Sequence, residues 1–212
     1  MKNFKKILSA VSAAVLCALP MINGVAVNAA SSEGKLDTYM VFCDVPANSG
    51  VMHCDFILYH SAEDQVQSIL GNISGGSLNT YSANRVDGTV SYYTQYKANG
   101  ALSASGTIFK VKVVTGSGAP EIDTPSAFDT NHIFINKKDV VKADLVLIGD
   151  VNGDKKVNIS DAVLIKQHLS NPKDYPLKEE QFRAADVNYD GVVNDDDALL
   201  IQQYEIKLIN HF

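Results

Sequence analysis

The stretch GDVNGDKKVN at residues 149–158 returns in altered form as ADVNYDGVVN at residues 185–194. When the two copies are aligned, oxygen-bearing side chains occupy positions 1, 3, 5, 9 and 12 of both. These residues are Asp150, Asn152, Asp154, Asn158 and Asp161 in the first copy, and Asp186, Asn188, Asp190, Asn194 and Asp197 in the second. Apolar residues at helical spacing follow each copy. The repeat therefore predicts one local structure made twice, a polar loop that leads into a helix.

The chemistry of these positions favours a hard divalent cation. Calcium takes six to eight oxygen ligands at about 2.3–2.6 Å, and a twelve-residue loop supplies them with a backbone carbonyl from position 7. Position 7 is Lys156 in the first copy and Val192 in the second. The carboxylates of a closed loop would repel one another without a cation, so we expect binding of two calcium ions to be coupled to folding. Asp and Asn also mark turns and helix caps, but two copies in register favour calcium.

Two positions depart from the general pattern of such loops. Position 12 is Asp in both copies, where Glu is usual. Position 6 is Lys155 in the first copy and Gly191 in the second. Because the sharp turn at position 6 favours Gly, we expect Lys155 to cost stability in the first loop.

Apolar spacing predicts helices over residues 160–169, 177–185 and 195–206. Each loop is thus followed by one helix, and residues 148–212 resemble a dockerin, the calcium-dependent module of secreted proteins in the cellulosomes of anaerobic bacteria. The resemblance implies that the ten residues above are ligands and that the partner is the cohesin of a scaffoldin, in a cell-surface complex for polysaccharide catabolism. It also implies partner contacts from Ile159, Ser160, Lys166 and Gln167 in the first copy, and from Asp195, Asp196, Gln202 and Gln203 in the second.

The two contact faces differ chemically, which favours one dominant binding orientation. We expect the first copy to be the recognition face, because Ile159 offers an apolar anchor and burial of Asp195 and Asp196 would require cationic partners. The apolar runs of the two helices are expected to pack together through Val163, Leu164, Ile165, Leu169, Leu199, Leu200 and Ile201. We also expect Leu145, Leu147 and Ile148 to meet Leu208, Ile209 and Phe212 as a clasp between the ends of this segment.

The amino terminus has the layout of a secretory signal peptide at residues 1–29. Lysines precede an apolar run from Ile7 to about Met21, and small residues follow near Ala29. The run is shorter than the roughly 20 residues that a membrane span needs, so we predict no span and a secreted, extracellular protein. A net charge of -6 without a basic cluster after the signal argues against a nucleic-acid partner. Cys43 and Cys54 then remain, as a disulfide or as two buried thiols.

Residues 31–147 have a different pattern, with short alternating and β-branched runs. Strands are predicted at 39–45, 51–60, 88–96, 106–114 and 132–136. Several short strands at this spacing indicate a β-sandwich. The fold class is therefore multidomain, an all-β sandwich followed by a small all-α domain. No Pro- or Thr-rich tether separates the halves, so we expect them to lie close together.

The sandwich carries no motif that predicts an enzyme, since its carboxylates and histidines form no recognisable catalytic pattern. A carbohydrate-binding module is one alternative, although the chain has no Trp. Tyr92 and Tyr96 would share one face of a strand, and Tyr93 would lie on the other.

A third alternative rests on VMHCDFILYHSAEDQVQSILGNI and DGTVSYYTQYKANGALSASGTIFKVKVV. These stretches resemble a cohesin from about Tyr39 to Ile148, although the usual first strand is missing. The resemblance implies a jelly-roll sandwich that receives a dockerin on strands matching residues 52–59 and 88–94. The whole chain would then be a small adaptor scaffoldin without catalytic activity, with a dockerin-bearing carbohydrate-binding module as the alternative.

Overall fold

The computed structural model describes residues 34–73, 75–131, 133, 135 and 140–212. Two antiparallel sheets form the amino-terminal half. Sheet A has the order β3-β6-β1-β9 and sheet B the order β4-β5-β2-β7, with β8 also paired to β2. The strands are β1 (Asp37–Val45), β2 (His53–Ser61), β3 (Gln65–Leu70), β4 (Gly76–Asn84), β5 (Thr89–Ala98), β6 (Gly106–Thr115), β7 (Glu121–Ile122), β8 (Ser126–Phe128) and β9 (Lys142–Leu147).

The sheets pack face to face because alternate residues of the central strands are apolar. Phe56, Tyr96 and Phe109 are almost fully buried between the sheets, and their rings contact one another. Burial of side chains of this size contributes about 1.5–3 kcal/mol each. The predicted sandwich is confirmed.

The strand predictions missed β3, β4, β7, β8 and β9. The residues of β4 are mostly polar and exposed, since this strand lies at the edge of sheet B and buries little of either face. The strand predicted at 132–136 is wrong for Ile133 and Ile135, which belong to no strand, and its other residues lie outside the described ones. In sheet A, β9 pairs directly with β1, and no strand lies between them.

Three helices form the carboxy-terminal region: α1 (Ile159–Ser170), α2 (Glu179–Ala185) and α3 (Asp195–Glu205). They match the three predicted helices to within two residues at each end. Asn158 and Asn194 cap α1 and α3, and Asp161 and Asp197 complete a capping box at each. The repeat thus produces the same helix start twice.

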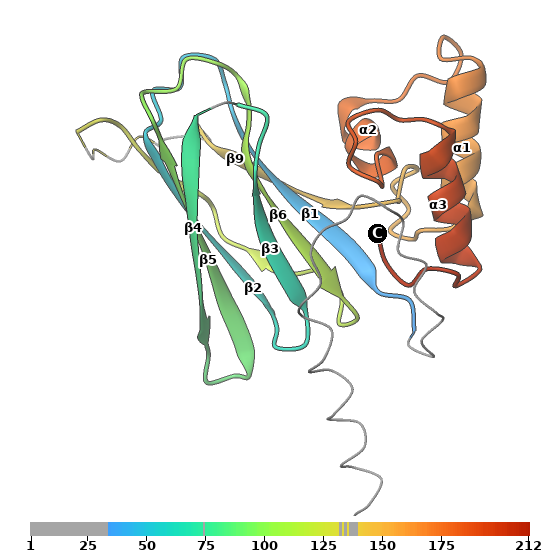
Figure 1. Ribbon diagram of the computed structural model, residues 1–212, viewed down its shortest axis with the longest axis horizontal. Coiled ribbons are helices and arrows are strands. Elements are labelled where there is room, and N and C mark those ends of the chain that lie inside the picture. The colour runs from blue at the N-terminus through green and yellow to red at the C-terminus, as the bar shows by residue number, and fades with distance from the viewer. Residues whose placement is uncertain (1–33, 74, 132, 134, 136–139) are drawn as a thin grey trace, which may run out of the picture.

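Sheet A lies between sheet B and the helices, so the chain forms three layers (Figure 1). The core under the helices includes Ile148, Ile209 and Phe212, and it also takes in Met40 and Phe42 from β1. The expected closeness of the sandwich and the helices is confirmed. The predicted clasp between the two ends of the helical region is also confirmed, with two exceptions. Leu208 is exposed, and Leu145 packs into the core of the sandwich.

The proposed signal peptide at residues 1–29 lies outside the described residues. Within the described ranges, no helix is long and apolar enough to cross a membrane. Cys43 and Cys54 are buried and not bonded to each other, and burial raises the pKa of both thiols. The structure therefore has two buried thiols at these positions and not the alternative, a disulfide.

Candidate metal loops and docking surfaces

The first loop wraps around the carboxylate of Asp150. The backbone N–H groups of Gly153 and Asp154 donate to its Oδ1 at 2.9 and 3.0 Å, and that of Lys155 donates to its Oδ2 at 2.9 Å. The carboxylate at position 1 therefore fixes the path of the chain through position 6.

Position 12 closes each loop from inside the protein. Asp161 is completely buried, and the N–H groups of Val151 and Asn158 donate to its two oxygens at 2.9 Å each. Asp197 is buried in the same way and accepts from Val187 at 3.0 Å. Burial raises the pKa of both carboxyls, while the backbone donors oppose that rise.

The second loop leaves one carboxylate oxygen without a protein donor. The N–H of Gly191 donates to Oδ2 of Asp186 at 3.1 Å, whereas Oδ1 of Asp186 is buried and has no hydrogen-bond partner. A buried carboxylate oxygen without a partner is costly unless a cation or donor meets it. This oxygen is the observation in the structure that fits a cation most directly.

Both loops take a left-handed backbone at positions 4 and 6. Gly153 and Lys155 have φ of 77° and 67° in the first loop, and Tyr189 and Gly191 have φ of 64° and 86° in the second. The sequence identified the strain at Lys155. It missed the equivalent strain at Tyr189, where the signal was Gly153 at the same position of the other copy.

No group of three or more His, Cys, Asp or Glu side chains is arranged to hold a metal ion in the portion of the chain that the structure describes. The loops offer amide and backbone carbonyl oxygens as well as carboxylates, and calcium prefers oxygen donors of this kind. The remaining ligand positions lie at or near the surface of the loops: Asn152, Asp154, Lys156, Asn158, Asn188, Asp190, Val192 and Asn194.

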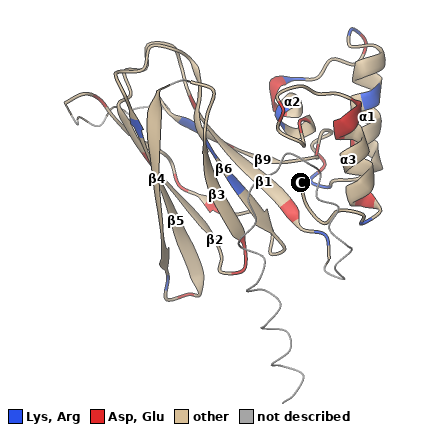
Figure 2. Cartoon of the chain, viewed as in Figure 1, with Lys and Arg blue, Asp and Glu red and all other residues tan. Residues whose placement is uncertain are grey.

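The predicted partner contacts belong to α1 and α3, and Lys166, Gln167, Asp195 and Gln202 among them meet where these two helices pack. Ile159 is 51% exposed, and Lys166 of α1 pairs with Asp195 of α3 at 2.6 Å. Ser160, Gln167 and Asp196 are also exposed, whereas Gln202 and Gln203 are half-buried. We call these residues together the α1–α3 surface. Asp195, Asp196 and Asp197 occupy the first turn of α3, and Figure 2 shows acidic residues at this end of the helix.

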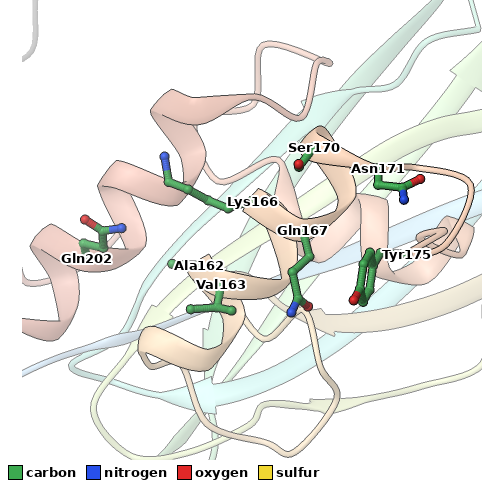
Figure 3. A pocket seen from close by; sticks show the side chains of 8 residues that line it. All are labelled: Ala162, Val163, Lys166, Gln167, Ser170, Asn171, Tyr175 and Gln202. Atoms are coloured by element: carbon green, nitrogen blue, oxygen red, sulfur yellow. The ribbon is translucent and has the colours of Figure 1, made fainter.

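A cavity of about 290 Å³ opens on the α1–α3 surface (Figure 3). Lys166 and Gln167 of α1 line it together with Gln202 of α3 and Tyr175 from the segment after α1. The structure thus brings predicted contacts from both copies of the repeat around one hollow.

The predicted helix core was partly wrong. Ile165 and Ile201 are fully buried, but Val163 and Leu199 are 49% and 48% exposed and Leu169 is exposed as well. A helix buries one face only, so a continuous apolar run must leave some of its members outside. Val163 and Leu199 occupy equivalent positions in the two copies and add apolar area to the α1–α3 surface.

The outer face of sheet B carries a second exposed group of apolar and aromatic residues. The rings of Tyr81 and Tyr93 stack at 4.5 Å between centroids, with an angle of 8° between their planes. Ile57 lies beside Tyr93 in the sheet register, and Arg85 lies over the ring of Tyr59. Tyr92 and Tyr96 point into the core, as alternation predicted, and Tyr93 points out, where it packs against Tyr81.

Three comparisons relate the chain to known proteins. No curated protein sequence matches it. Among solved structures, a non-cellulosomal cohesin from the hyperthermophilic archaeon Archaeoglobus fulgidus is similar at 11% sequence identity and a TM-score of 0.36, over 48% of this chain and 75% of that chain. Residues 148–204 match the model of the dockerin type I domain. The predicted dockerin is confirmed, and the chain therefore carries a protein–protein interaction module of the cellulosome type.

Proposed function

We propose that this protein is a non-catalytic adaptor with two ends. The dockerin, residues 148–212, anchors it to a cohesin of a scaffoldin with two calcium ions bound, and the sandwich, residues 31–147, receives a dockerin of another protein. One observation carries the proposal. The helices cover the outer face of sheet A, so the α1–α3 surface and the outer face of sheet B remain exposed on opposite sides of the three layers (Figure 1).

Calcium would occupy the two loops, held by the ten oxygen-bearing side chains and by the carbonyls of Lys156 and Val192. The buried, unpartnered oxygen of Asp186 supports this assignment, as does the supply of hard oxygen donors at every expected position. Bound calcium would supply the positive charge that lets these carboxylates lie close together. The residues of the loops themselves order the start of α1 and α3, because Asp161 and Asp197 belong both to the loop and to the helix cap.

The calcium assignment is tested on the full chain by isothermal titration calorimetry. The wild-type chain should bind two calcium ions, and the double variant Asp150→Ala with Asp186→Ala should bind none. Asp174→Ala is the matched control, because Asp174 is an exposed aspartate in the turn after α1 and outside both loops. A wild-type chain that binds no calcium at millimolar concentration would contradict the proposal.

The cohesin of the scaffoldin would dock on the α1–α3 surface, with the first copy as the recognition face. Ile159 provides an apolar centre next to polar side chains, and an exposed apolar residue surrounded by a polar rim is typical of an energetic anchor. Its equivalent in the second copy, Asp195, already pairs with Lys166 at the surface. An exposed pair of this kind contributes little to binding or stability.

Equivalent substitutions in the two copies test the recognition face. Ile159→Asp should weaken binding to a cohesin of the source organism by about tenfold or more, whereas Asp195→Ala should change it by less than about threefold. Both changes lie in the first turn of a helix at exposed positions, so the calcium-loaded fold should persist. If Asp195→Ala instead abolished binding while Ile159→Asp had no effect, the second copy would be the recognition face.

The sandwich would receive its partner on the outer face of sheet B, on strands β2 and β5. A protein partner is favoured over a sugar by the geometry of the tyrosines. The rings of Tyr81 and Tyr93 stack on each other and so cover some of each other's faces, whereas sugar platforms need aromatic faces that are open to the ligand.

An array of dockerins and insoluble polysaccharides of the source organism distinguishes these partners. The full chain should capture a dockerin, and the double variant Tyr81→Ala with Tyr93→Ala should lose that capture while it still binds a cohesin. Retention by polysaccharide with no dockerin captured would make the sandwich a carbohydrate-binding module instead. Release of reducing sugar would contradict the non-catalytic assignment.

The location follows from the same proposal. Dockerin-bearing proteins of cellulosomes are typically extracellular, and we propose that this chain is secreted and held in a complex at the cell surface. The layout of residues 1–29 supports export.

A further inference from the structure

Strand β1 is buried on both of its faces. Val41 and Cys43 point into the core between the sheets, whereas Met40 and Phe42 belong to the core under the helices. Met40 is 1% exposed and Phe42 is 7% exposed. A strand at this position in a two-layer sandwich would expose one face to water. Here the same strand belongs to two hydrophobic cores.

Polar contacts tie the same strand to α2. The guanidinium of Arg183 lies 4.6 Å from the centre of the Phe42 ring, and its Nη2 lies 2.7 Å from Oδ2 of Asp44. The side chains of this ion pair are 19% and 21% exposed. Since both charges are shielded from water, the pair is more sensitive to relative movement of the sandwich and the helices than a surface pair would be.

The start of β1 is tied to α3 and to the carboxyl terminus. The hydroxyl of Tyr204 donates to Oδ1 of Asp37 at 3.2 Å. The N–H of Phe212 donates to Oγ1 of Thr38 at 3.3 Å, and the N–H of Leu36 donates to the carbonyl of Asn210 at 2.8 Å. The strand is thus held to the helical region at both of its ends.

Both candidate metal loops lie at this interface. The N–H of Ile148, just before the first loop, donates to the carbonyl of Thr38 at 2.8 Å. In the second loop, the ring of Tyr189 covers the ammonium of Lys112 on β6 at 4.7 Å from its centre. Lys112 and Tyr189 are both half-buried, so the contact is partly shielded from water.

We propose that β1 joins the sandwich and the helical region into a single calcium-linked folding unit, in which cation binding at the loops stabilises the sandwich. This inference rests on the proposed calcium binding. A ligand that binds only the folded loops stabilises every segment whose unfolding also unfolds them. Because β1 cannot leave the sandwich without opening the core under the helices, the sandwich is such a segment. By linkage, folding of the sandwich strengthens calcium binding by the same factor by which calcium binding favours folding of the sandwich.

Hydrogen exchange on the full chain, with calcium and with chelator, tests the coupling. In the wild-type chain, calcium should slow exchange of the sandwich amides on β6 and on β5, which belongs to sheet B on the far side from the helices, by about tenfold or more. The double variant Arg183→Met with Tyr204→Phe removes polar ties across the interface and should reduce this slowing severalfold. The expected result is that calcium slows amide exchange less in this double variant than in the wild-type chain.

The matched control makes the same chemical changes on the far side of the sandwich. Arg85 lies over the ring of Tyr59, and the hydroxyl of Tyr59 donates to Asp123 at 2.8 Å, so Arg85→Met with Tyr59→Phe alters an equivalent pair on sheet B. This variant should keep the full effect of calcium on exchange. An equal loss in the control variant would show general destabilisation and would overturn the coupling.

Calorimetry on the same samples distinguishes a failure of the proposed coupling from a failure of the proposed calcium binding. If no calcium binds, the calcium assignment fails. If two ions bind and exchange on β5 and β6 is unchanged, calcium binding stands and the coupling is overturned.

Discussion

At the scale of single residues, the two loops reach one backbone shape by different means. Each loop needs a left-handed residue at positions 4 and 6, and each has one glycine for the two places. The first loop puts Gly153 at position 4 and Lys155 at position 6, whereas the second puts Tyr189 at position 4 and Gly191 at position 6. The left-handed conformation costs a residue with a Cβ about 1–2 kcal/mol. Each loop thus bears one such cost.

The cost at Lys155 has no compensation in its side chain, which is exposed. Lys155→Gly should therefore stabilise the calcium-loaded chain by about 0.5–1 kcal/mol, since relief of the left-handed strain exceeds the added flexibility of the unfolded chain. Urea unfolding with excess calcium measures this difference. A variant less stable than wild type would mean that the aliphatic portion of Lys155 packs on the loop.

The equivalent substitution in the second loop should destabilise the chain, whereas Lys155→Gly stabilises it. Tyr189→Gly relieves the same strain, but it also removes a partly buried ring that packs against the core under the helices and exposes Lys112. Loss of a large, fully buried side chain costs about 3–5 kcal/mol and this ring is partly buried, so the net effect should be a destabilisation of roughly 1–3 kcal/mol. The same urea titration compares the two variants, and equal effects would contradict the compensation at Tyr189.

The sequence predicted one of these strained positions and not the other for a physical reason. Loop chemistry sets an expectation for glycine at position 6, so Lys155 stood out against Gly191. At position 4 the pattern tolerates many residues, and a tyrosine there looks like an ordinary exposed loop residue. Its anchor, Lys112, comes from a distant strand, and a contact of that kind has no local signature.

At the scale of elements, the positions of the loops and helices could be predicted from the sequence, whereas the buried face of each helix could not. The start of a helix depends on residues a few positions apart, so the starts of α1 and α3 could be predicted to within one residue. The side of α1 and α3 that is buried depends on neighbouring elements. Runs such as Val163–Leu164–Ile165 offer apolar residues all round the helix, and only the packing of α1 against α3 selects Ile165 as the core member.

Because only some residues of this apolar run are buried, their substitution by alanine should destabilise the chain by different amounts. Ile165→Ala should destabilise the calcium-loaded chain by about 2–5 kcal/mol, because the side chain is fully buried. Val163→Ala should cost less than about 1 kcal/mol, since half of that side chain is already exposed and Ala favours the helix. Thermal and chemical unfolding of both variants measures the difference, and similar costs would show that Val163 is buried in solution.

Strand β1 did carry a signal of its double burial. Its Met40, Val41, Phe42 and Cys43 are apolar in succession, and a continuous apolar run is typical of a strand covered on both faces. The run predicted a strand but not its second cover, because the helices that supply it lie more than a hundred residues away in the chain. Strands β3 and β4 escaped notice for the converse reason, since edge strands need few apolar residues.

At the scale of the whole molecule, the layers keep the two exposed surfaces apart. Sheet A and the core under the helices separate the α1–α3 surface from the outer face of sheet B (Figure 1). Sites without shared contacts contribute to binding independently. A cohesin bound at one end should therefore leave the other end unobstructed.

Independent ends predict a ternary complex. With saturating calcium, the Kd of the full chain for a captured dockerin should change by less than about twofold when a cohesin already occupies the α1–α3 surface. Calorimetric titration of the preformed binary complex measures this directly. Displacement of one partner by the other would show that both compete for one surface, and the molecule would then have a single end.

The junction between the sandwich and the helical region has a consequence for the resistance of the chain to proteolysis. Strand β9 ends at Leu147, Ile148 is fully buried, and a Cβ at Gly149 would lie 2.9 Å from the ring of Phe212. A protease needs several residues of extended, accessible chain to cut, and such segments concentrate in exposed loops. Residues 147–149 offer none, so cleavage at this junction must wait until the cores on either side of β1 have opened.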